Sequence, residues 1–266
     1  MKLKYIVLWC PIVISMLALS IDLNTKKAIV IGASHGIGKE VAKILVDKGY
    51  QVGLVSRNNK ALSRLQKNLG GQTITKKIDI TKSGAQKSLD DLIYQMNGVD
   101  VVIISAGIWP EIGGNGAIPW EDERDTITTN VSGFVAVANI ALNHFIEQGY
   151  GHLVGISSVD AVRGSATAPT YCASKAFVST YMEGMRNKFL QSKLPIYITD
   201  IRPGYVKTYD IQESAYWVLS PEQAAQDTYD AILKKKKVAY TTKRWWIIAK
   251  LLQITPDYIY NKMGGF

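Results

Sequence analysis

A tyrosine and a lysine stand four residues apart in the run Tyr171-Cys172-Ala173-Ser174-Lys175. If this segment is a helix, both side chains lie on one face. A lysine ammonium beside a phenol favours the phenolate, so we expect the pKa of Tyr171 to fall from about 10 toward neutral pH. Such a phenol can give a proton to a carbonyl oxygen or take one from an alcohol. The pair alone is weak evidence, because Tyr and Lys at this spacing are more often two half-solvated side chains.

A glycine-rich turn lies near the start of the chain. It follows a short apolar run at 27–31 and precedes a helical pattern at 41–48. Glycines let the backbone approach a pyrophosphate at a helix N-terminus, where free N–H groups and the helix dipole favour anions. The spacing is G-x-x-x-G-x-G rather than the commoner G-x-G-x-x-G. We therefore expect a phosphate-binding turn formed by Gly32, Ser34, His35, Gly36, Ile37 and Gly38.

Three further apolar runs end in residues suited to a dinucleotide. Arg57 follows the run at 52–56, where an acidic residue would hold the ribose hydroxyls of NAD, whereas arginine suits the 2′-phosphate of NADP. The alternative is an ordinary exposed arginine. Asp79, followed by Ile80, ends the run at 73–78 and could accept from the adenine amino group or cap the next helix. The small residues Ser105-Ala106-Gly107 end the run at 99–104, where a cofactor would pass.

Strand-like and helix-like segments alternate along the chain. The strand-like runs are 27–31, 52–56, 73–78, 99–104, 152–156 and 196–201, and the helical patterns are 41–48, 82–96, 122–147 and 170–192. Short apolar strands separated by helices indicate a parallel sheet covered on both faces. We predict an α/β, doubly wound (Rossmann) fold with about seven strands, whose ligands bind beyond the carboxyl ends of the strands. Ser220-Pro221-Glu222-Gln223 predicts one more helix start, capped by Ser220.

With these residues in place, the chain resembles the short-chain dehydrogenase/reductase family over roughly residues 26–240. The resemblance rests on motifs in the right order: Gly32/Gly36/Gly38, Asp79, Ser105-Ala106-Gly107, Asn130, Ser157-Ser158, Tyr171/Lys175, and Pro203-Gly204 with Thr208. Two positions depart from the family pattern. Ile31 replaces the Thr that often precedes the first glycine, and Ser105 replaces the usual Asn. Both concern local hydrogen bonding rather than chemistry.

The resemblance implies a role for each matching residue. Tyr171 would be the general acid/base, while Lys175 would lower its pKa and bind the ribose. Ser158, in preference to Ser157, would hydrogen-bond the substrate oxygen. Asn130 would hold a water that relays protons through Lys175. The cofactor would also contact small residues at two more strand ends, namely Ala106, Gly107, Pro203, Gly204, Val206 and Thr208, with Thr208 near the carboxamide.

These roles describe an NADP(H)-dependent oxidoreductase that moves a hydride between nicotinamide and a carbonyl carbon, while two hydroxyls stabilise charge on the oxygen. Large aromatic residues follow the fourth and sixth strands: Trp109, Trp120, Tyr205, Tyr209, Tyr216 and Trp217. They suggest a hydrophobic ketone or secondary alcohol, lipid- or steroid-like, unless they serve ordinary loop packing. The alternative function is a non-catalytic NADP(H)-binding regulatory relative, and the complete catalytic set argues against it.

Composition bounds the remaining possibilities. With 266 residues, 47% of them hydrophobic, the chain suits one catalytic domain at 26–240 with appendages at 1–25 and 241–266. The net charge of +9 is concentrated at the two ends, and the segment between them is nearly neutral. We therefore expect no nucleic-acid partner. Cys10 and Cys172 belong to no Cys/His cluster in the sequence, which predicts no metal site and a reducing compartment.

The N-terminal run at 5–21 contains no charged residue and has about the minimum length for spanning a bilayer. It could be a secretory signal cleaved at Ala18-Leu19-Ser20, an uncleaved anchor, or upstream sequence of a product that starts at Met16. We favour the anchor, because a secreted protein would leave the compartment that supplies the cofactor. The expected location is therefore a membrane, on its cytoplasmic side, with a soluble cytoplasmic protein as the alternative.

Near the other end, the four-lysine run Lys234–Lys237 precedes the segment 243–252, which combines basic residues with paired tryptophans. That composition suits a helix at a membrane interface, or equally a helix docked on its own domain or on a partner subunit. We expect membrane contact through both ends of the chain. Family habit adds a homo-oligomer, dimer or tetramer, in which the helices near 122–147 and 170–192 pair.

Overall fold

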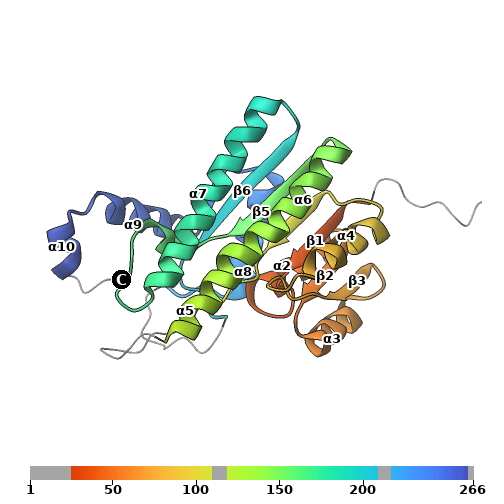
Figure 1. Ribbon diagram of the computed structural model, residues 1–266, viewed down its shortest axis with the longest axis horizontal. Helices are drawn as coiled ribbons and strands as arrows, with labels where there is room; N and C mark the ends of the chain where they lie inside the picture. Colours follow the sequence, from red (N-terminus) through yellow and green to blue (C-terminus); the bar gives the residue numbers. More distant parts are fainter. Residues whose placement is uncertain (1–24, 110–118, 209–216, 263–266) are drawn as a thin grey trace, which may run out of the picture.

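The computed structural model describes residues 25–109, 119–208 and 217–262 (Figure 1). Within these residues the strands form one parallel sheet of seven, in the order β3-β2-β1-β4-β5-β6-β7. The strands are β1 (Lys27–Ile31), β2 (Gln51–Ser56), β3 (Thr73–Lys77), β4 (Val101–Ile104), β5 (Gly151–Ile156), β6 (Ile196–Pro203) and β7 (Val238–Thr241). The chain moves outward from β1 to β3 and then returns to place β4 beside β1. This order confirms the predicted doubly wound fold.

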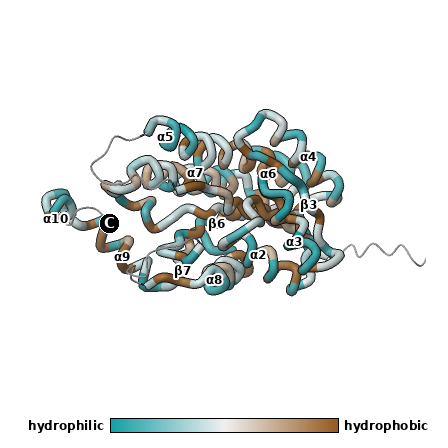
Figure 2. Tube along the Cα trace, turned by 90° about the horizontal axis from the view of Figure 1, so that it is seen from below, coloured by the Kyte–Doolittle hydropathy of each residue, from teal (hydrophilic) through white to brown (hydrophobic). Residues whose placement is uncertain are grey.

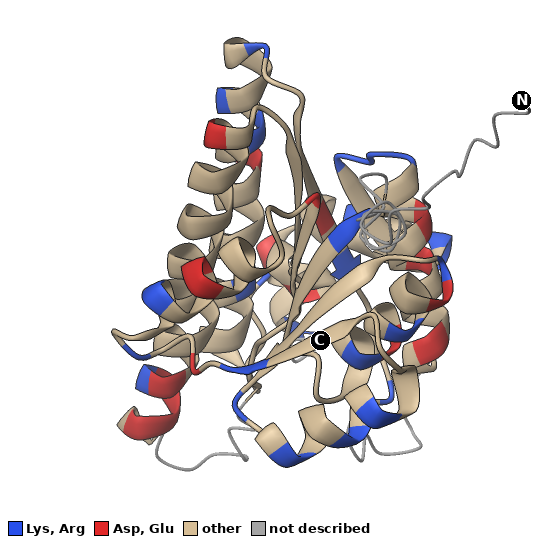
Figure 3. Cartoon of the chain, turned by 90° about the vertical axis from the view of Figure 1, so that its right-hand side faces the viewer, with Lys and Arg blue, Asp and Glu red and all other residues tan. Residues whose placement is uncertain are grey.

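Helices cover the sheet in two layers. They are α2 (Gly36–Asp47), α3 (Asn59–Leu69), α4 (Ala85–Gln95), α5 (Trp120–Ile127), α6 (Phe134–Gln148), α7 (Pro169–Ser192), α8 (Pro221–Leu233), α9 (Lys243–Ile254) and α10 (Asp257–Lys262). Side chains of α2, α3, α8 and α9 belong to one buried cluster, and those of α4, α6 and α7 belong to the other. Charged residues of both signs are spread over the helices (Figure 3), as expected for a body with little net charge.

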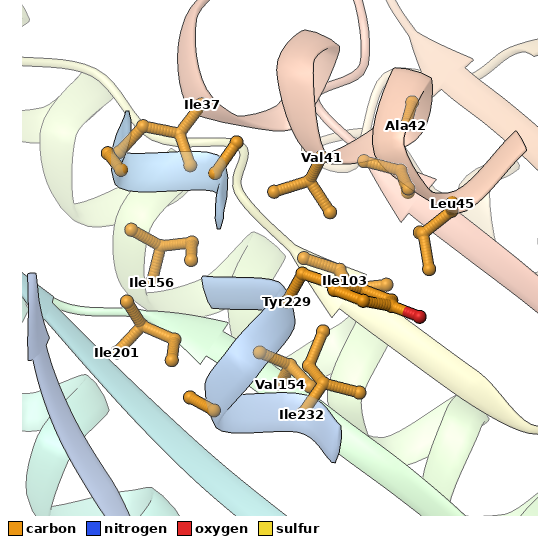
Figure 4. Close-up of a cluster of buried hydrophobic side chains, with 14 of the residues drawn as sticks. Ile37, Val41, Ala42, Leu45, Ile103, Val154, Ile156, Ile201, Tyr229 and Ile232 are labelled. Carbon is orange, nitrogen blue, oxygen red and sulfur yellow. The ribbon is translucent and has the colours of Figure 1, made fainter. Parts of the chain in front are cut away.

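The strands read as continuous apolar runs because both of their faces are buried. In β1, Ala28 and Val30 belong to the cluster under α2 and α8, whereas Ile29 and Ile31 belong to the cluster on the opposite face. Figure 4 shows the first cluster, where side chains of α2 and α8 meet those of the central strands. Figure 2 shows apolar stretches along the strands inside the molecule. The carboxyl ends of the strands are therefore held in place by a packed helical layer on each face of the sheet.

The structure differs from the sequence-based expectation at two places. The helix predicted at 122–147 is broken by a π-helical segment, Thr128–Gly133, between α5 and α6. The last strand, β7, was not placed from the sequence; it directly follows the lysine run, which forms an exposed turn after α8 rather than part of the helix. The predicted cap is confirmed, because the Ser220 hydroxyl accepts from the backbone N–H of Gln223 at 3.2 Å.

The C-terminal segment packs against the body. Trp245 of α9 is buried in the core cluster, and its indole covers Gly204, where an added Cβ would come within 2.0 Å of the ring. Of the alternatives for 243–252, docking on its own domain is therefore observed. The boundary expected at residue 240 falls inside β7. Among the described residues no helix has the length and apolarity to cross a bilayer, and the apolar run at 5–21 lies outside them.

Candidate active site

A cleft of about 1160 Å³ lies at the carboxyl edge of the sheet, beyond β1, β2, β4, β5 and β6. Most residues expected to bind the cofactor line it: Gly32, Ser34, His35, Gly36, Ile37, Arg57, Asp79, Ile80, Ala106, Gly107, Tyr171, Lys175, Pro203, Gly204, Val206 and Thr208. Ser158 lines it as well. Gly38 and Asn130 are the expected site residues that do not form its wall. Both lie directly behind the wall and contact residues that form it: Gly38 packs against Gly32, and Asn130 accepts from the backbone N–H of Ile108.

Close approach of backbone explains the glycine turn. Gly32 has φ +93°, and a Cβ there would lie 2.7 Å from the backbone nitrogen of Ala106. Gly36 has φ +56°, and a Cβ there would lie 2.9 Å from the methyl of Thr208. A Cβ on Gly38 would lie 2.5 Å from the carbonyl oxygen of Gly32. The turn therefore brings the start of α2 against the ends of β4 and β6 with no room for side chains.

The start of α2 suits an anion. No side chain caps the first turn of this helix, so its N–H groups face the cleft with the positive end of the helix dipole. The backbone N–H groups of Gly32 and Ala33 both donate to Val55 O, at 2.8 and 3.0 Å, which ties the turn to β2. A cradle without side chains beside uncapped amides fits the pyrophosphate of a dinucleotide.

Arg57, His35 and Asp79 gather at the outer end of the cleft, beyond β2. Burial and the nearby Arg57 charge hold the pKa of His35 below its usual value. The pKa of Asp79 is also lowered: burial acts to raise it, but hydrogen bonds from Thr81 and the charge of Arg57 outweigh burial. The guanidinium is therefore close to both groups. A 2′-phosphate placed between Arg57 and the turn would meet positive charge.

Asp79 does not cap the helix that follows it. Its Oδ1 accepts from the backbone N–H of Thr81 at 3.0 Å and from the Thr81 hydroxyl at 2.7 Å. Helix α4 begins later, at Ala85, with Gly84 in the capping position. The capping alternative is therefore wrong, because the Asp79 carboxylate accepts its hydrogen bonds from Thr81, two residues later, and not from the first turn of α4. Asp79 remains on the cleft wall, where an adenine amino group would lie.

Lys175 is buried beneath the cleft on α7. Its Nζ donates to the carbonyl oxygen of Ile156 at 2.9 Å and lies 5.5 Å from the centroid of the Tyr171 ring. Burial lowers the pKa of Lys175 to about 8, although the carboxylates of Asp200 and Asp160 act to raise it. The expected side-by-side placement on one helix face is therefore observed.

The expected fall in the pKa of Tyr171 is not observed. Burial of the phenol raises its pKa, and the charge of Asp160 raises it further, whereas its hydrogen bond with Ser158 acts to lower it. Two features of this site could not be predicted from the four-residue spacing of Tyr171 and Lys175. Lys175 directs its ammonium to Ile156 O, and a carboxylate shares the pocket with the phenol. In the protein alone Tyr171 is protonated at neutral pH.

The two neighbouring serines point in different directions. The Ser158 hydroxyl donates to Asp160 Oδ2 at 3.0 Å, accepts from the Asp160 backbone N–H at 3.1 Å, and is hydrogen-bonded with Tyr171. The Ser157 hydroxyl is buried, donating to the carboxylate of Asp200 and to Ile201 O. Both serines line the cleft, but only Ser158 is hydrogen-bonded with Tyr171, and the choice of Ser158 as the substrate-binding serine stays a prediction.

Asn130 braces the site from behind. It lies in the π-helical segment, and its side-chain amide both accepts from Ile108 N at 2.8 Å and donates to Ile108 O at 2.9 Å. It also donates to the Ser174 hydroxyl at 3.1 Å. These bonds join the segment after β4 to α7 one residue before Lys175. The water-holding role of Asn130 stays a prediction.

The end of the cleft beside Tyr171 and Ser158, which we call the substrate end, contains residues that were not predicted from the sequence. Asp160, Trp245 and Ile248 line it together with Trp109, Tyr205 and Trp217. Trp120 was expected here but is 63% exposed and does not line the cleft. Tyr209 and Tyr216 lie outside the described residues. Asp160 had a usable signal, because it stands two residues after Ser158. The segment that forms α9 was expected to dock on its own domain as one alternative, but nothing in its sequence pointed to the cleft.

Comparison with known proteins agrees with this geometry. The family model described as short chain dehydrogenase matches residues 26–217. An uncharacterized oxidoreductase of Myxococcus xanthus is 32% identical over 215 residues, covering 79% of this chain and 82% of that protein.

Two solved structures share the fold. A short-chain dehydrogenase from Sphingobium yanoikuyae, in complex with NADPH, has TM-score 0.75 and 21% identity over 87% of this chain and 97% of its own. A short-chain dehydrogenase/reductase from Burkholderia phymatum, in complex with NAD, has TM-score 0.76 and 16% identity over 92% of this chain and 97% of its own. The fold thus accepts either nicotinamide cofactor. By its matched residues, its relative and its cleft, the chain belongs to the short-chain dehydrogenase family of oxidoreductases.

Proposed function

We propose that this protein is an NADP(H)-dependent oxidoreductase that interconverts a hydrophobic ketone and its secondary alcohol, with Tyr171 as general acid/base. One observation carries the proposal. Tyr171, Ser158 and Lys175 meet at one end of a cleft whose other end combines an uncapped helix start with Arg57. A proton donor and an anion cradle at opposite ends of one cleft suit a carbonyl substrate beside a dinucleotide phosphate.

The residues divide the work of carbonyl reduction. Bound NADPH supplies the hydride. Tyr171 donates its phenolic proton to the substrate oxygen, and the Ser158 hydroxyl hydrogen-bonds the same oxygen as negative charge develops. The raised pKa of Tyr171 keeps the phenol protonated at neutral pH, which is the form that reduction needs. Lys175 holds a positive charge beneath the ring and offers N–H donors to the ribose.

The cofactor preference rests on Arg57. Its guanidinium is near His35 and Asp79 at the outer end of the cleft, and no acidic residue stands at this strand end to hold a ribose 2′-hydroxyl. A charge-assisted contact with a 2′-phosphate therefore favours NADP(H) over NAD(H).

The walls of the substrate end favour an apolar compound. Trp109 lies with its ring centroid 6.0 Å from that of Tyr171, and Tyr205 and Trp217 lie 5.5 and 6.1 Å from Trp245. Such rings bury flat or aliphatic groups well and add few polar contacts. Consumption of NADPH with a panel of aryl and alkyl ketones tests the proposal. If the full chain binds NADPH yet turns over none of them, the non-catalytic alternative replaces it.

We also propose that α9 contacts an anionic membrane surface. Its inner face, with Trp245, is buried, but Trp246, Ile247 and Leu251 on the outer face are each about half exposed. Lys243, Arg244 and Lys250 are exposed on the same helix. Basic residues beside a half-exposed apolar face suit the interface of an anionic bilayer. Sedimentation with phosphatidylserine-containing vesicles should exceed that with phosphatidylcholine alone and fall in Trp246→Ser/Leu251→Ser; equal sedimentation contradicts the proposal.

A homo-oligomer is proposed from α6 and α7. Both helices keep large apolar side chains on the surface, including Ile146, Phe177 and Leu190. Phe177 stacks on Tyr181 with ring centroids 6.1 Å apart, which makes a flat apolar patch on α7. Pairing of such faces is common in this family. Light scattering after size exclusion should give a multiple of the 29.4 kDa chain mass, and a monomer at micromolar concentration contradicts the proposal.

A further inference from the structure

A carboxylate at the substrate end of the cleft has no ion-pair partner among the described residues. Asp160 lies in the short 3₁₀ turn after β5 (Val159–Val162) and lines the cleft. Its Oδ2 accepts from the Ser158 hydroxyl at 3.0 Å. Within the described residues its carboxylate forms no ion pair. Burial raises the pKa of Asp160, while Ser158 and the charge of Lys175 act to lower it. A partly buried acid with one neutral partner calls for a ligand.

Arg163 and Arg202 are ion-paired with other acids, and Lys175 is shared between two carboxylates. Lys175 donates to the neutral carbonyl oxygen of Ile156, and the charges of both Asp200 and Asp160 act on it. Arg202 is paired with Asp200 at 2.8 Å. Arg163, three residues after Asp160, is paired with Asp257 at 2.6 Å and donates to two carbonyl oxygens at the end of α9. The segments 110–118 and 209–216 contain no lysine or arginine. Among the described residues the guanidinium of Arg244 lies 5.9 Å from the Trp217 ring, but no cation is ion-paired with Asp160, so a ligand can bring the pairing charge.

The groups around Asp160 are aromatic. Its charge raises the pKa of both Tyr171 and Tyr205, after the larger effect of burial in each case, so the carboxylate is close to both rings. Trp109 packs beside Tyr171, and Trp217 faces Trp245 on the same stretch of wall. A carboxylate among aromatic faces attracts an alkylammonium group twice, through the ion pair and through cation–π contacts. A neutral lipid or sterol has no positive charge to pair with the Asp160 carboxylate.

We propose that Asp160 binds the ammonium group of an amino ketone or amino alcohol, which is the substrate class of this cleft, with the cation packed against its aromatic wall. The inference rests on the proposed function, because it concerns the substrate of the same site. It also assigns Asp160 an effect on Ser158. In the protein alone the Ser158 hydroxyl donates to Asp160. The positive charge of a cation bound at Asp160 weakens the carboxylate as an acceptor, which frees the serine proton for the substrate oxygen.

A matched pair of ketones tests the recognition. One is an aryl ketone that carries a trimethylammonium group, and the other carries a neutral tert-butyl group of the same shape. With the full chain and saturating NADPH, the cationic ketone should have a kcat/KM at least about 30-fold above that of the neutral one, the scale of a buried charge contact. Equal values for the two ketones overturn the proposal.

Asp160→Asn keeps an acceptor for Ser158 but removes the charge. The cationic-to-neutral ratio of kcat/KM should fall at least about 30-fold in this variant. Asp125→Asn is the matched control, because Asp125 is an exposed acid on α5 that does not line the cleft. It changes the net charge equally and should leave the ratio unchanged. A ratio that is the same in Asp160→Asn and Asp125→Asn shows that Asp160 serves only as an acceptor for the Ser158 hydroxyl, and the proposal then fails.

Binding without turnover separates this inference from the catalytic proposal. Phenethyltrimethylammonium and its neutral carbon analogue are measured by calorimetry against the NADP⁺-loaded protein. Binding of the cation that is lost in Asp160→Asn supports the inference even if no ketone is reduced, an outcome that would sink the proposed function alone. Turnover of ketones with no discrimination by charge, in kinetics and in calorimetry, leaves the proposed function intact and overturns the inference.

Discussion

The two ends of the cleft are built by different means. The phosphate end is the part of the cleft formed by the glycine turn 32–38 and Arg57. Its shape depends mostly on this short turn, because Gly32 and Gly36 have positive φ and the absence of their side chains allows close backbone approach. At the substrate end, side chains from β4, β5, α7, β6 and α9 converge, and their charges act on one another. The first end depends on conformation within a few residues. The second depends on electrostatics among residues that are distant in the sequence.

The largest expected effect comes from removing the proton donor. Tyr171→Phe keeps the ring beside Trp109 but removes the phenolic hydroxyl that meets Ser158. Turnover of a ketone substrate should fall by at least about 100-fold, the scale of a lost general acid. NADPH affinity, measured by cofactor fluorescence, should change little, because the phosphate end is untouched.

Tyr197→Phe is the control for this variant. Tyr197 lies on β6, is partly exposed, and does not line the cleft. It loses the same hydroxyl and should retain wild-type turnover. If Tyr171→Phe also retains it, the substrate end has another proton donor and the assignment of Tyr171 is wrong.

A charge reversal at Arg57 tests the opposite end. Arg57→Asp removes the cation that would meet a 2′-phosphate and places an acid where ribose hydroxyls lie. The ratio of kcat/KM for NADPH to that for NADH should fall about 10- to 100-fold, as expected for losing hydrogen bonds to a charged group. Steady-state rates with both cofactors measure it.

The matching change on a neighbouring helix is Arg64→Asp. Arg64 is exposed on α3 and is absent from the cleft wall. It alters the net charge by the same amount, so its cofactor ratio should stay near that of the wild type. An equal fall in both variants means that the overall charge, and not a contact made by Arg57, sets the preference.

A glycine pair tests whether backbone shape alone builds the phosphate end. Gly32→Ala and Gly49→Ala both put a side chain at positive φ, +93° and +83°, and therefore share the same conformational strain. Only Gly32 has a neighbour in the way, the Ala106 nitrogen at 2.7 Å; nothing lies near Gly49. Titration with NADPH should show affinity reduced about tenfold in Gly32→Ala alone, because only there does the added methyl clash with the Ala106 backbone, at a cost of about 1–3 kcal/mol that displaces the turn. Similar affinities would mean that the turn adapts.

The same contrast explains how far the sequence carried. The phosphate end could be predicted because its signals are local: the glycine spacing, the strand before it and the arginine after the next strand. The doubly wound parallel sheet could also be predicted, because short apolar runs alternate with helical patterns along the chain. The pKa of Tyr171 could not be predicted, because it depends on burial and on Asp160, which meet the phenol only in the folded chain. Trp245 reaches the cleft through α9, for which no motif existed.

The smallest expected effect is a pH limb at the substrate end. Burial lowers the pKa of Lys175 to about 8, so the ammonium is charged below this pH and is lost as pH rises through it. The kcat/KM for NADPH, which reports the unliganded enzyme, should therefore be level below this pKa and fall about tenfold per pH unit above it. A profile that stays flat well beyond pH 8 would mean that Lys175 does not titrate there or is not needed charged.

Asp160→Asn sharpens this measurement. The Asp160 carboxylate acts to raise the pKa of Lys175, so its neutralisation should move the limb to lower pH. Asp125→Asn, on the exposed surface of α5, should leave the limb in place. Because Arg57 and the glycine turn contain no group that this change reaches, a shift seen only in Asp160→Asn assigns the pH dependence to the substrate end. If the limb stays in place in both variants, the charge of Asp160 does not affect the pKa of Lys175. The substrate end would then lack the electrostatic coupling that distinguishes it from the phosphate end.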